Sequence, residues 1–218
     1  MTDKPQEGAE QNGQRRQPKQ ARSAETYESI LKAAAELFAD AGYEQTTTHQ
    51  IAQRASISVG ALYRYFSDKQ AVLLELYRRE ITNTRQQLLD QFDITDLVAA
   101  DVREIIRRTL SLAFDVYSEH AGLRRVLGEQ SRKISALVEL RREQETELLG
   151  AVSRILGAAA EVRLPDVELS AYLVTVFFDG LIEDYVLRQS DPPRFERDRV
   201  IDSATDLILR YALGKSER

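Results

Sequence analysis

Residues 47–69 read TTHQIAQRASISVGALYRYFSDK, and this stretch carries the clearest structural pattern of the chain. Thr47 and Gln50 have the spacing of a capping box, in which two side chains satisfy free backbone N–H groups at the start of a helix. Ser58 is placed to cap a second short helix in the same way. The stretch therefore predicts two short helices joined by a tight turn, the first running through Ala55 and the second from the Ser58 cap through Phe66.

An apolar stripe at helical spacing lies on the N-terminal side of this stretch. Its members are Tyr27, Ile30, Leu31, Ala34, Leu37, Phe38 and Ala41. Residues that recur every three or four positions predict one long helix. Gly42 can then adopt the left-handed conformation that ends a helix, with Tyr43 folded back on Phe38. We expect a three-helix module of the helix-turn-helix type at residues 23–68.

On the C-terminal side, Ser67 and Gln70 repeat the capping pattern and open a long helix. Its predicted inward residues are Val72, Leu73, Leu76, Tyr77 and Leu88. Periodic apolar residues predict further helices at about 97–119, 123–129, 131–160, 166–189 and 194–212, with prolines at two of the breaks. No segment alternates as a strand does. The predicted fold class is all-α, with a helical domain at residues 69–218 after the helix-turn-helix module.

The distribution of charge matters more than its total. The net charge is −5 and the isoelectric point is about 5.3, which taken alone disfavours a nucleic-acid partner. However, no acidic residue lies between Glu10 and Glu25 or between Glu44 and Asp68. The basic residues in these windows are Arg15, Arg16, Lys19, Arg22, Arg54 and Arg64. Local positive potential therefore coexists with overall acidity.

Residues 1–22 are rich in Gln, Gly, Pro and charged side chains and contain almost no apolar side chain. Such a segment cannot bury enough surface to offset the entropy lost on ordering. We predict a disordered basic arm at residues 1–22.

A capped helix, a tight turn and a second short helix with small residues at its exposed start form the geometry that enters the major groove of DNA. Thr47 and Thr48 can offer hydroxyl groups to a phosphate. Gly60 and Ala61 lack bulk and let the backbone approach the bases. Lys69, at the start of the next helix, is within reach of another phosphate.

The side chains after Ala61 divide between two roles. We expect Leu62 and Phe66 to face the core. Tyr63 and Tyr65 would reach the sugar-phosphate walls of the groove, because successive non-core positions cannot all turn inward on one helix. Arg64 can bind guanine in a bidentate manner or contact a phosphate. The alternative is that all four apolar and aromatic side chains belong to the core of an ordinary helical corner.

The run Ile51-Ala52-x-x-Ala55-x-Ile57-Ser58-x-Gly60-x-Leu62-Tyr63-x-Tyr65-Phe66-x-x-Lys69 follows the helix end Leu37-Phe38-x-x-x-Gly42. Together they resemble the DNA-binding module of TetR-family repressors. The family places the following matching positions at or near the DNA: Thr47, Thr48, Ser58, Val59, Gly60, Ala61, Tyr63, Arg64, Tyr65 and Lys69. One departure is Ser56, where the family usually has Gly; a left-handed Ser there costs on the order of 1 kcal/mol.

The resemblance also implies roles for the helical domain. It implies a homodimer in which the last two long helices pair with their copies as a four-helix bundle, with these candidate seam residues: Phe178, Leu181, Ile182, Tyr185, Leu207, Ile208 and Tyr211. Two recognition helices can read half-sites roughly 34 Å apart, whereas one reads too few base pairs. It also implies a small-molecule effector pocket inside this domain, with these candidates: Phe114, Tyr117, His120, Tyr172 and Phe177. For each of them ordinary core packing is the alternative, and His120 can simply end its helix.

Other classes of protein fit the sequence less well. The chain has no Cys and only His49 and His120, so clustered metal ligands or a nucleophile motif are missing, and we expect no metal, no cofactor and no enzymatic activity. No apolar run has the roughly 20 residues needed to span a bilayer, and no signal peptide precedes the first helix, so we expect a cytoplasmic protein with no membrane partner. The most plausible function is a repressor of a palindromic operator, released by its effector. A helical enzyme and a helical module that docks protein instead of DNA are the two alternatives.

Overall fold

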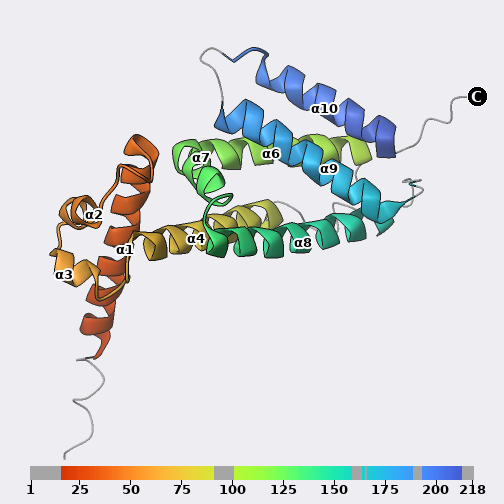
Figure 1. The fold of residues 1–218 in the computed structure, drawn as a ribbon. Coiled ribbons are helices and arrows are strands. Elements are labelled where there is room, and N and C mark those ends of the chain that lie inside the picture. Colours follow the sequence, from red (N-terminus) through yellow and green to blue (C-terminus); the bar gives the residue numbers. More distant parts are fainter. Residues whose placement is uncertain (1–15, 91–100, 159–163, 165, 189–192, 213–218) are drawn as a thin grey trace, which may run out of the picture. The chain divides into compact units, whose positions relative to one another are not determined.

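The computed structural model describes residues 16–90, 101–158, 164, 166–188 and 193–212, and all regular elements in these ranges are helical (Figure 1). The all-α prediction is confirmed. The chain divides into two compact units between Leu76 and Tyr77. The boundary predicted after residue 68 coincides instead with the start of a helix that contributes to both units.

The first unit contains helices α1 (Arg16–Ala41), α2 (Thr48–Arg54) and α3 (Val59–Leu62) and the first turns of α4 (Lys69–Asp90). Figure 1 shows α2 and α3 on one side of the long helix α1. The buried apolar side chains of this unit are Ile30, Leu31, Ala33, Ala34, Phe38, Ile51, Ala52, Leu62, Phe66, Val72, Leu73 and Leu76. This core holds the two short helices in place, because helices of seven and four residues are not stable alone.

The local signals at the helix ends form as predicted. Gly42 has a φ of +83°, its N–H donates to the carbonyl of Phe38 over 3.0 Å, and the ring of Tyr43 lies 5.4 Å from that of Phe38. Thr47 caps α2 in a complete capping box with Gln50. Ser56, in the turn between α2 and α3, has a left-handed φ of +57°, so the cost of a Ser in place of the family's usual Gly applies here.

Three boundaries of the first unit differ from the predictions. Helix α1 begins at Arg16, so residues 16–22 are helical and only the rest of the predicted arm, residues 1–15, lies outside the described residues. Arg, Gln, Lys and Ala are strong helix formers and Pro18 falls in the first turn, where proline is tolerated. Asp68, not Ser67, caps α4, because its carboxylate accepts the N–H of Ala71 over 2.7 Å.

The third difference concerns α3, which ends at Leu62 rather than at Phe66. The chain continues in tight turns, with the N–H groups of Tyr65 and Phe66 both donating to the carbonyl of Leu62. This keeps Phe66 beneath the segment even though the regular helix has ended.

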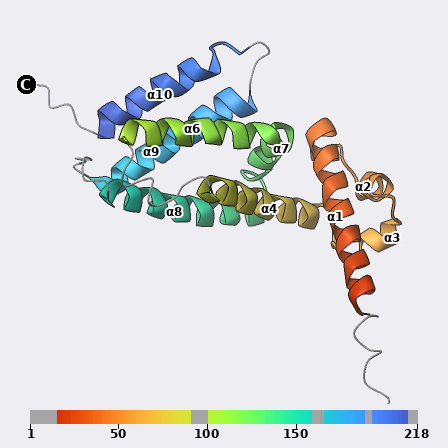
Figure 2. The same cartoon turned by 180° about the vertical axis from the view of Figure 1, so that it is seen from behind.

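The second unit contains the rest of α4 together with α6 (Val102–Glu119), α7 (Ala121–Gln130), α8 (Ser135–Ala158), α9 (Val167–Ile182), the π-helical turn η1 (Glu183–Leu187) and α10 (Arg197–Ala212). In both views α9 lies against α8 and α10 lies against α6 (Figures 1 and 2). Its core cluster contains Leu110, Ala113, Phe114, Ile182, Val186, Ile201, Ala204 and Ile208. Among the described residues, no helix is long and apolar enough to cross a membrane.

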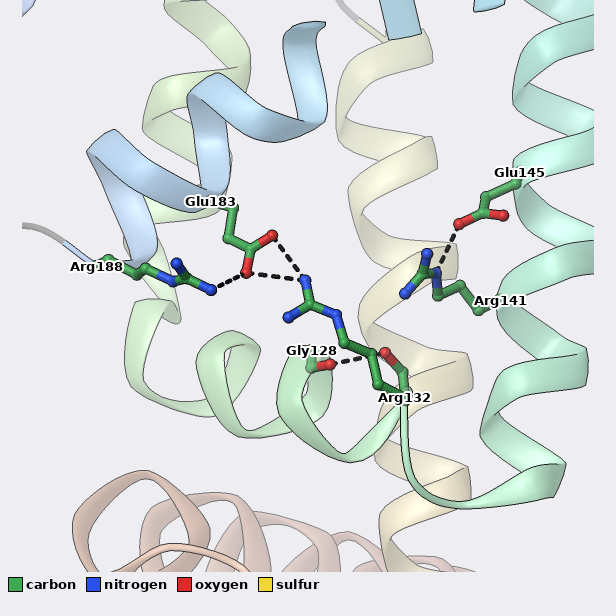
Figure 3. Close-up of polar contacts among 7 residues, drawn as sticks. Gly128, Arg132, Arg141, Glu145, Glu183 and Arg188 are labelled. Carbon is green, nitrogen blue, oxygen red and sulfur yellow. Dashed lines mark hydrogen bonds and ion pairs between the residues drawn. The ribbon is translucent and has the colours of Figure 1, made fainter. Parts of the chain in front are cut away.

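The turn η1 interrupts the single helix predicted at residues 166–189. The N–H of Arg188 donates to the carbonyl of Glu183, five residues earlier, over 3.0 Å. The Glu183 carboxylate accepts hydrogen bonds from Arg132 and Arg188 (Figure 3). The hydrogen bond from Arg132 is the main reason why the pKa of Glu183 lies below its usual value. These contacts hold the π-helical turn to the loop between α7 and α8.

Candidate nucleic-acid interface

The segment from Ser58 to Phe66 presents one face to solvent and the other to the core. Leu62 is 0% exposed and Phe66 is buried, whereas Tyr63 is 51% exposed. Gly60 and Arg64 are also exposed. The interpretation that placed all the aromatic residues of this segment in the core is therefore wrong for Tyr63. The outward face consists of small residues first and then an aromatic and a cationic side chain.

Gly60 is not required by the packing of the protein itself. Ser58 caps α3 by accepting the N–H of Ala61 over 3.1 Å, and Gly60 lies within the following helical turn. A Cβ atom added at Gly60 would meet no other atom within 4 Å. Because Gly destabilises a helix by roughly 0.5–1 kcal/mol relative to Ala, the fold alone gives no reason for it. The bare backbone of this turn leaves room for close approach by a partner.

Two hydroxyl pairs fix the aromatic side chains of the segment. The hydroxyl groups of Thr48 and Tyr63 lie 3.2 Å apart, so the start of α2 and the end of α3 present them together. The hydroxyl of Tyr65 lies 3.2 Å from that of Ser23, on α1. In each pair one hydroxyl proton bridges the two oxygens, and the other proton is free to be donated to a phosphate oxygen.

Sequence reasoning missed the part that α1 plays in this surface. The Tyr27 ring lies 6.2 Å from that of Tyr65 and stacks at 5.0 Å on Phe66. The sequence marks Tyr27 only as a core residue and indicates no role for Ser23. The one available signal is their position, because Ser23 lies inside the first acid-free window and Tyr27 lies just after it.

Lys69 has a structural role that its sequence position did not indicate. Its ammonium group donates to the carbonyls of Tyr43 over 2.6 Å and Thr46 over 2.8 Å, and it lies 4.1 Å from the centre of the Tyr43 ring. Partial burial lowers the pKa of Lys69 below its ordinary value. Two of its three N–H bonds therefore hold the turn before α2, and one remains for a phosphate.

The other cations and caps of this surface have different environments. Arg54 is paired with Glu36 over 2.9 Å, which offsets its charge. Thr47 is exposed, but its hydroxyl is part of the capping box. Ser58 is exposed and Val59 is half-buried beside it. Of the two cations in the second acid-free window, Arg64 is thus the more available to a partner.

The second unit has an apolar surface on α9 and α10. The exposed apolar residues of α9 are Leu169, Tyr172, Leu173 and Val176, at the spacing of one helical face, and those of α10 are Leu207 and Tyr211. The hydroxyl of Tyr211 lies 3.0 Å from that of Ser170, which links the two helices at this surface. We refer to these six apolar residues as the α9–α10 surface.

The predicted dimer seam overlaps this surface only in part. Leu207, 53% exposed, and Tyr211 belong to it. Ile182 and Ile208 are buried in the core cluster, and Phe178, Leu181 and Tyr185 pack against that cluster. Within one chain, the predicted residues of α9 thus lie on the face that packs against the core, and the exposed apolar residues lie on the other face. Because α9 is apolar nearly all round, its sequence does not reveal which side is covered.

The predicted effector residues separate into two groups. Phe114 belongs to the core cluster, and Tyr117 and Phe177 pack against it. Tyr172 is 53% exposed on the α9–α10 surface. His120 is exposed at the end of α6, where its ring lies 3.0 Å from a carboxylate oxygen of Glu80. Tyr172 and His120 are therefore corrected: neither lies in the interior, and His120 ends its helix as the alternative reading proposed.

A small cleft lies beside Phe114, one of the predicted effector residues that belong to the core. It has a volume of about 170 Å³ and is lined by Phe114, Ser118, Tyr185, Val186, Pro193 and Arg197. Typical small-molecule sites have roughly 300–1,000 Å³. As it stands, this cleft is too small for most ligands. Among the described residues, no group of His, Asp or Glu side chains has the arrangement of a metal site.

Residues 58–65, which we call the recognition segment, face outward from the three-helix unit. This arrangement defines a helix-turn-helix DNA-binding regulator. The family described as "Bacterial regulatory proteins, tetR family" matches residues 30–76, and that described as "Tetracyclin repressor-like, C-terminal domain" matches residues 101–211. The second match alone covers half of the chain. The chain belongs to the TetR family of bacterial regulatory proteins.

Individual relatives are similar over different shares of the chain. The A-factor receptor protein of Streptomyces griseus is 46% identical over 54 residues, which are 25% of this chain and 20% of that protein. The Fatty acid metabolism regulator protein of Bacillus subtilis is 28% identical over 130 residues, 60% of each protein. The chain thus spans less than two thirds of the length of either relative. A crystal structure of a transcriptional regulator from Rhodococcus sp. Rha1 covers 85% of this chain and 97% of its own, with a TM-score of 0.68 and 21% identity, and shares the fold.

Proposed function

We propose that the protein is a homodimeric transcriptional repressor that binds a palindromic operator in the cytoplasm and is released by a small-molecule effector. The observation that carries the proposal is the outward face of residues 58–65, where Gly60, Tyr63 and Arg64 are exposed above a buried Leu62. A helix presented in this way fits the major groove.

In this proposal the exposed and half-buried groups of this surface have different roles in binding. The hydroxyl groups of Thr48, Tyr63 and Tyr65, with the remaining N–H of Lys69, contact phosphates and fix the register on the duplex. Arg64 reaches a base edge, where a bidentate guanidinium discriminates guanine. Thr47, Ser58, Val59 and Ala61 complete the contact surface around Gly60.

Dimerisation through the α9–α10 surface supports a palindromic site. Six large apolar side chains gathered on two neighbouring helices are costly to leave in water, and a two-fold axis would bury each set against its copy. Two recognition segments related by that axis read inverted half-sites. The seam we propose is therefore Leu169, Tyr172, Leu173, Val176, Leu207 and Tyr211, which keeps two of the originally predicted residues.

The effector is proposed to act within the second unit and to change the course of α4. Phe114, Tyr117 and Phe177 remain candidates for apolar contacts with it, beside the small cleft. Helix α4 contributes residues to both units, so a ligand that favours one position of α4 favours one position of the recognition segments. The operator is then released because the two positions of α4 give the protein different affinities for DNA.

The experiment that tests the proposal is selection of bound fragments from the genome, followed by fluorescence anisotropy with the selected duplex over a range of salt concentrations. We expect selective binding that weakens steeply with salt, because phosphate contacts release counterions. Arg64→Ala should lose roughly 1–3 kcal/mol of binding free energy and relax the preference at one base pair, whereas Tyr63→Phe should weaken binding to all sequences equally. Binding that is indifferent to both sequence and salt would refute the proposal.

A further inference from the structure

Asp179, near the end of α9, is a carboxylate without a partner in the second unit. Among the residues that the structure describes, no hydrogen bond or ion pair reaches it. The side chain is exposed, yet burial raises its pKa to about 6, and the charge of Glu145 adds to the rise. Protein therefore surrounds much of this carboxylate while a small molecule can still reach it. Carboxylates with perturbed pKa values gather at functional sites.

The carboxylates nearest to Asp179 are already paired. Glu145 lies 2.6 Å from Arg141 on α8, and Glu183 lies 2.7 Å from Arg132 (Figure 3). Asp179 precedes Glu183 by four residues, so both lie on the same side of the helix. Besides burial, the charges of Glu145 and Glu183 raise the pKa of Asp179, whereas that of Arg141 lowers it. The potential around Asp179 is therefore negative and attracts a cation.

Two tyrosines on other helices are close to these charges. Burial raises the pKa of Tyr77, on α4, to about 12, and the charges of Arg141 and Glu145 also act on it. Burial likewise raises the pKa of Tyr117, on α6, and the charge of Asp179 adds to that rise. Both hydroxyl groups therefore stay protonated and bring no charge. Aromatic rings near an unpaired carboxylate are the combination that binds organic cations.

Two buried polar atoms near this group have no hydrogen-bond partner in the described part of the chain. They are the hydroxyl oxygen of Thr175, one turn before Asp179 on α9, and Nε of Arg124. The Arg124 side chain is only 8% exposed, and its guanidinium lies 4.6 Å from the centre of the Tyr117 ring. Glu80, at 3.0 Å, offsets its charge. Because an unpartnered buried polar group costs roughly 1–3 kcal/mol, a ligand with polar groups of its own would remove this cost.

We propose that the effector is an organic cation whose positively charged group binds Asp179 and whose apolar body lies against Tyr77 and Tyr117. The inference rests on the proposed function, which puts the effector in the second unit, and it names the charge of that effector. An ammonium group donates a charge-assisted hydrogen bond to the carboxylate, which is stronger than a bond between neutral groups. The Thr175 hydroxyl can accept a further N–H of the same ligand.

Isothermal titration calorimetry of the full chain without DNA tests the inference with three probes that share one apolar body. The probes are phenylbutylamine, phenylbutanol and phenylbutyrate. At about pH 8 the amine is a cation and the Asp179 carboxyl, with its pKa of about 6, is ionised. We expect the amine to bind at least about tenfold more tightly than the alcohol, and the carboxylate to bind more weakly still. Equal affinities, a preference for the carboxylate, or no binding of the amine would overturn the inference.

Asp179→Asn removes the charge and keeps the size of the side chain. It should weaken binding of the amine at least about tenfold and leave binding of the alcohol unchanged. Asp184→Asn is the matched control, because Asp184 is exposed and, five residues further on, lies on another side of the helix. This control should bind the amine as the parent does. Equal binding of the amine by Asp179→Asn and the parent would overturn the inference.

Fluorescence anisotropy with the genome-selected duplex separates this inference from the proposed function. We expect the amine, and not the alcohol at the same concentration, to release the duplex from the parent. An amine that binds without changing the affinity for the duplex would overturn its role as effector. If the amine fails to bind while the parent binds the duplex selectively, the inference fails and the DNA-binding function stands. A parent that binds no duplex selectively would overturn the proposed function, and calorimetry would still decide whether the cation binds Asp179.

Discussion

Replacing Gly60 by Ala separates the demands of the fold from those of DNA binding. Gly60 lies in the first turn of α3, its φ is not in the left-handed region, and a Cβ atom there meets nothing within 4 Å. The added methyl group therefore costs nothing in the free protein and lowers the conformational entropy of the unfolded chain. We expect Gly60→Ala to raise the free energy of unfolding by about 0.5–1 kcal/mol.

The same methyl group would lie at the closest approach of α3 to the bases. Keeping the recognition segment a fraction of an ångström farther from the groove weakens several contacts together, and a loss of about 1.4 kcal/mol corresponds to tenfold weaker binding. We expect the variant to bind the operator at least about tenfold more weakly than the parent. Denaturant unfolding measures the first effect and fluorescence anisotropy measures the second.

Gly128→Ala is the matched control for this prediction. Gly128 is also helical, in α7, and a Cβ atom there meets nothing within 4 Å. This variant should gain similar stability and keep the parent's affinity for DNA. If Gly60→Ala binds the operator as tightly as the parent, close approach at Gly60 is not needed and the reasoning from its open surroundings fails.

Three further predictions concern other parts of the chain. Lys69→Met removes two charge-assisted hydrogen bonds to backbone carbonyls, so thermal unfolding should show a loss of about 1–3 kcal/mol; an unchanged melting temperature would contradict the structural role of Lys69. Val176→Glu places a charge in the proposed seam and should weaken the dimer by about 3 kcal/mol or more, which analytical ultracentrifugation would detect as monomer; a dimer of unchanged affinity would exclude this face. Asp179 stays in contact with solvent, but partial burial and then the negative charge of Glu145 raise the pKa of its carboxyl to about 6, while Arg141 opposes the rise. Because the folded state favours the protonated form, the parent should lose stability as the pH rises from about 4 to about 6. Asp179→Asn should be more stable than the parent above pH 6, with little difference near pH 4. If the variant and the parent have equal melting temperatures at both ends of this range, the pKa of Asp179 is not raised in the folded protein.

The local signals in the sequence predicted the first unit well. The capping box at Thr47, the cap at Ser58 and the left-handed Gly42 each depend on a few neighbouring residues. Such features follow from backbone hydrogen bonding over one helical turn, so the sequence around them contains all the information they need. The outward orientation of Tyr63 followed from the same reasoning.

Features that depend on distant residues were not predictable. The Lys69 ammonium group meets carbonyls that lie more than twenty residues earlier, so its structural role needs the folded turn. On α9, Tyr172 and Ile182 are both apolar, and only the packing of α8 and α6 determines that the first is exposed and the second buried. The start of α1 was misplaced because polar residues with high helix propensity extend a helix that its apolar stripe has already stabilised.

The central claim is that the outward face of residues 58–65 meets the bases of DNA. Photocrosslinking tests it most directly, with a benzophenone side chain introduced at Arg64 or, as a control, at the exposed Glu143 on α8. We expect the probe at Arg64 to crosslink to the genome-selected duplex within the selected sequence, and the probe at Glu143 to give no crosslink. Crosslinks from Glu143, or none from Arg64 while the protein still binds the duplex, would contradict the claim.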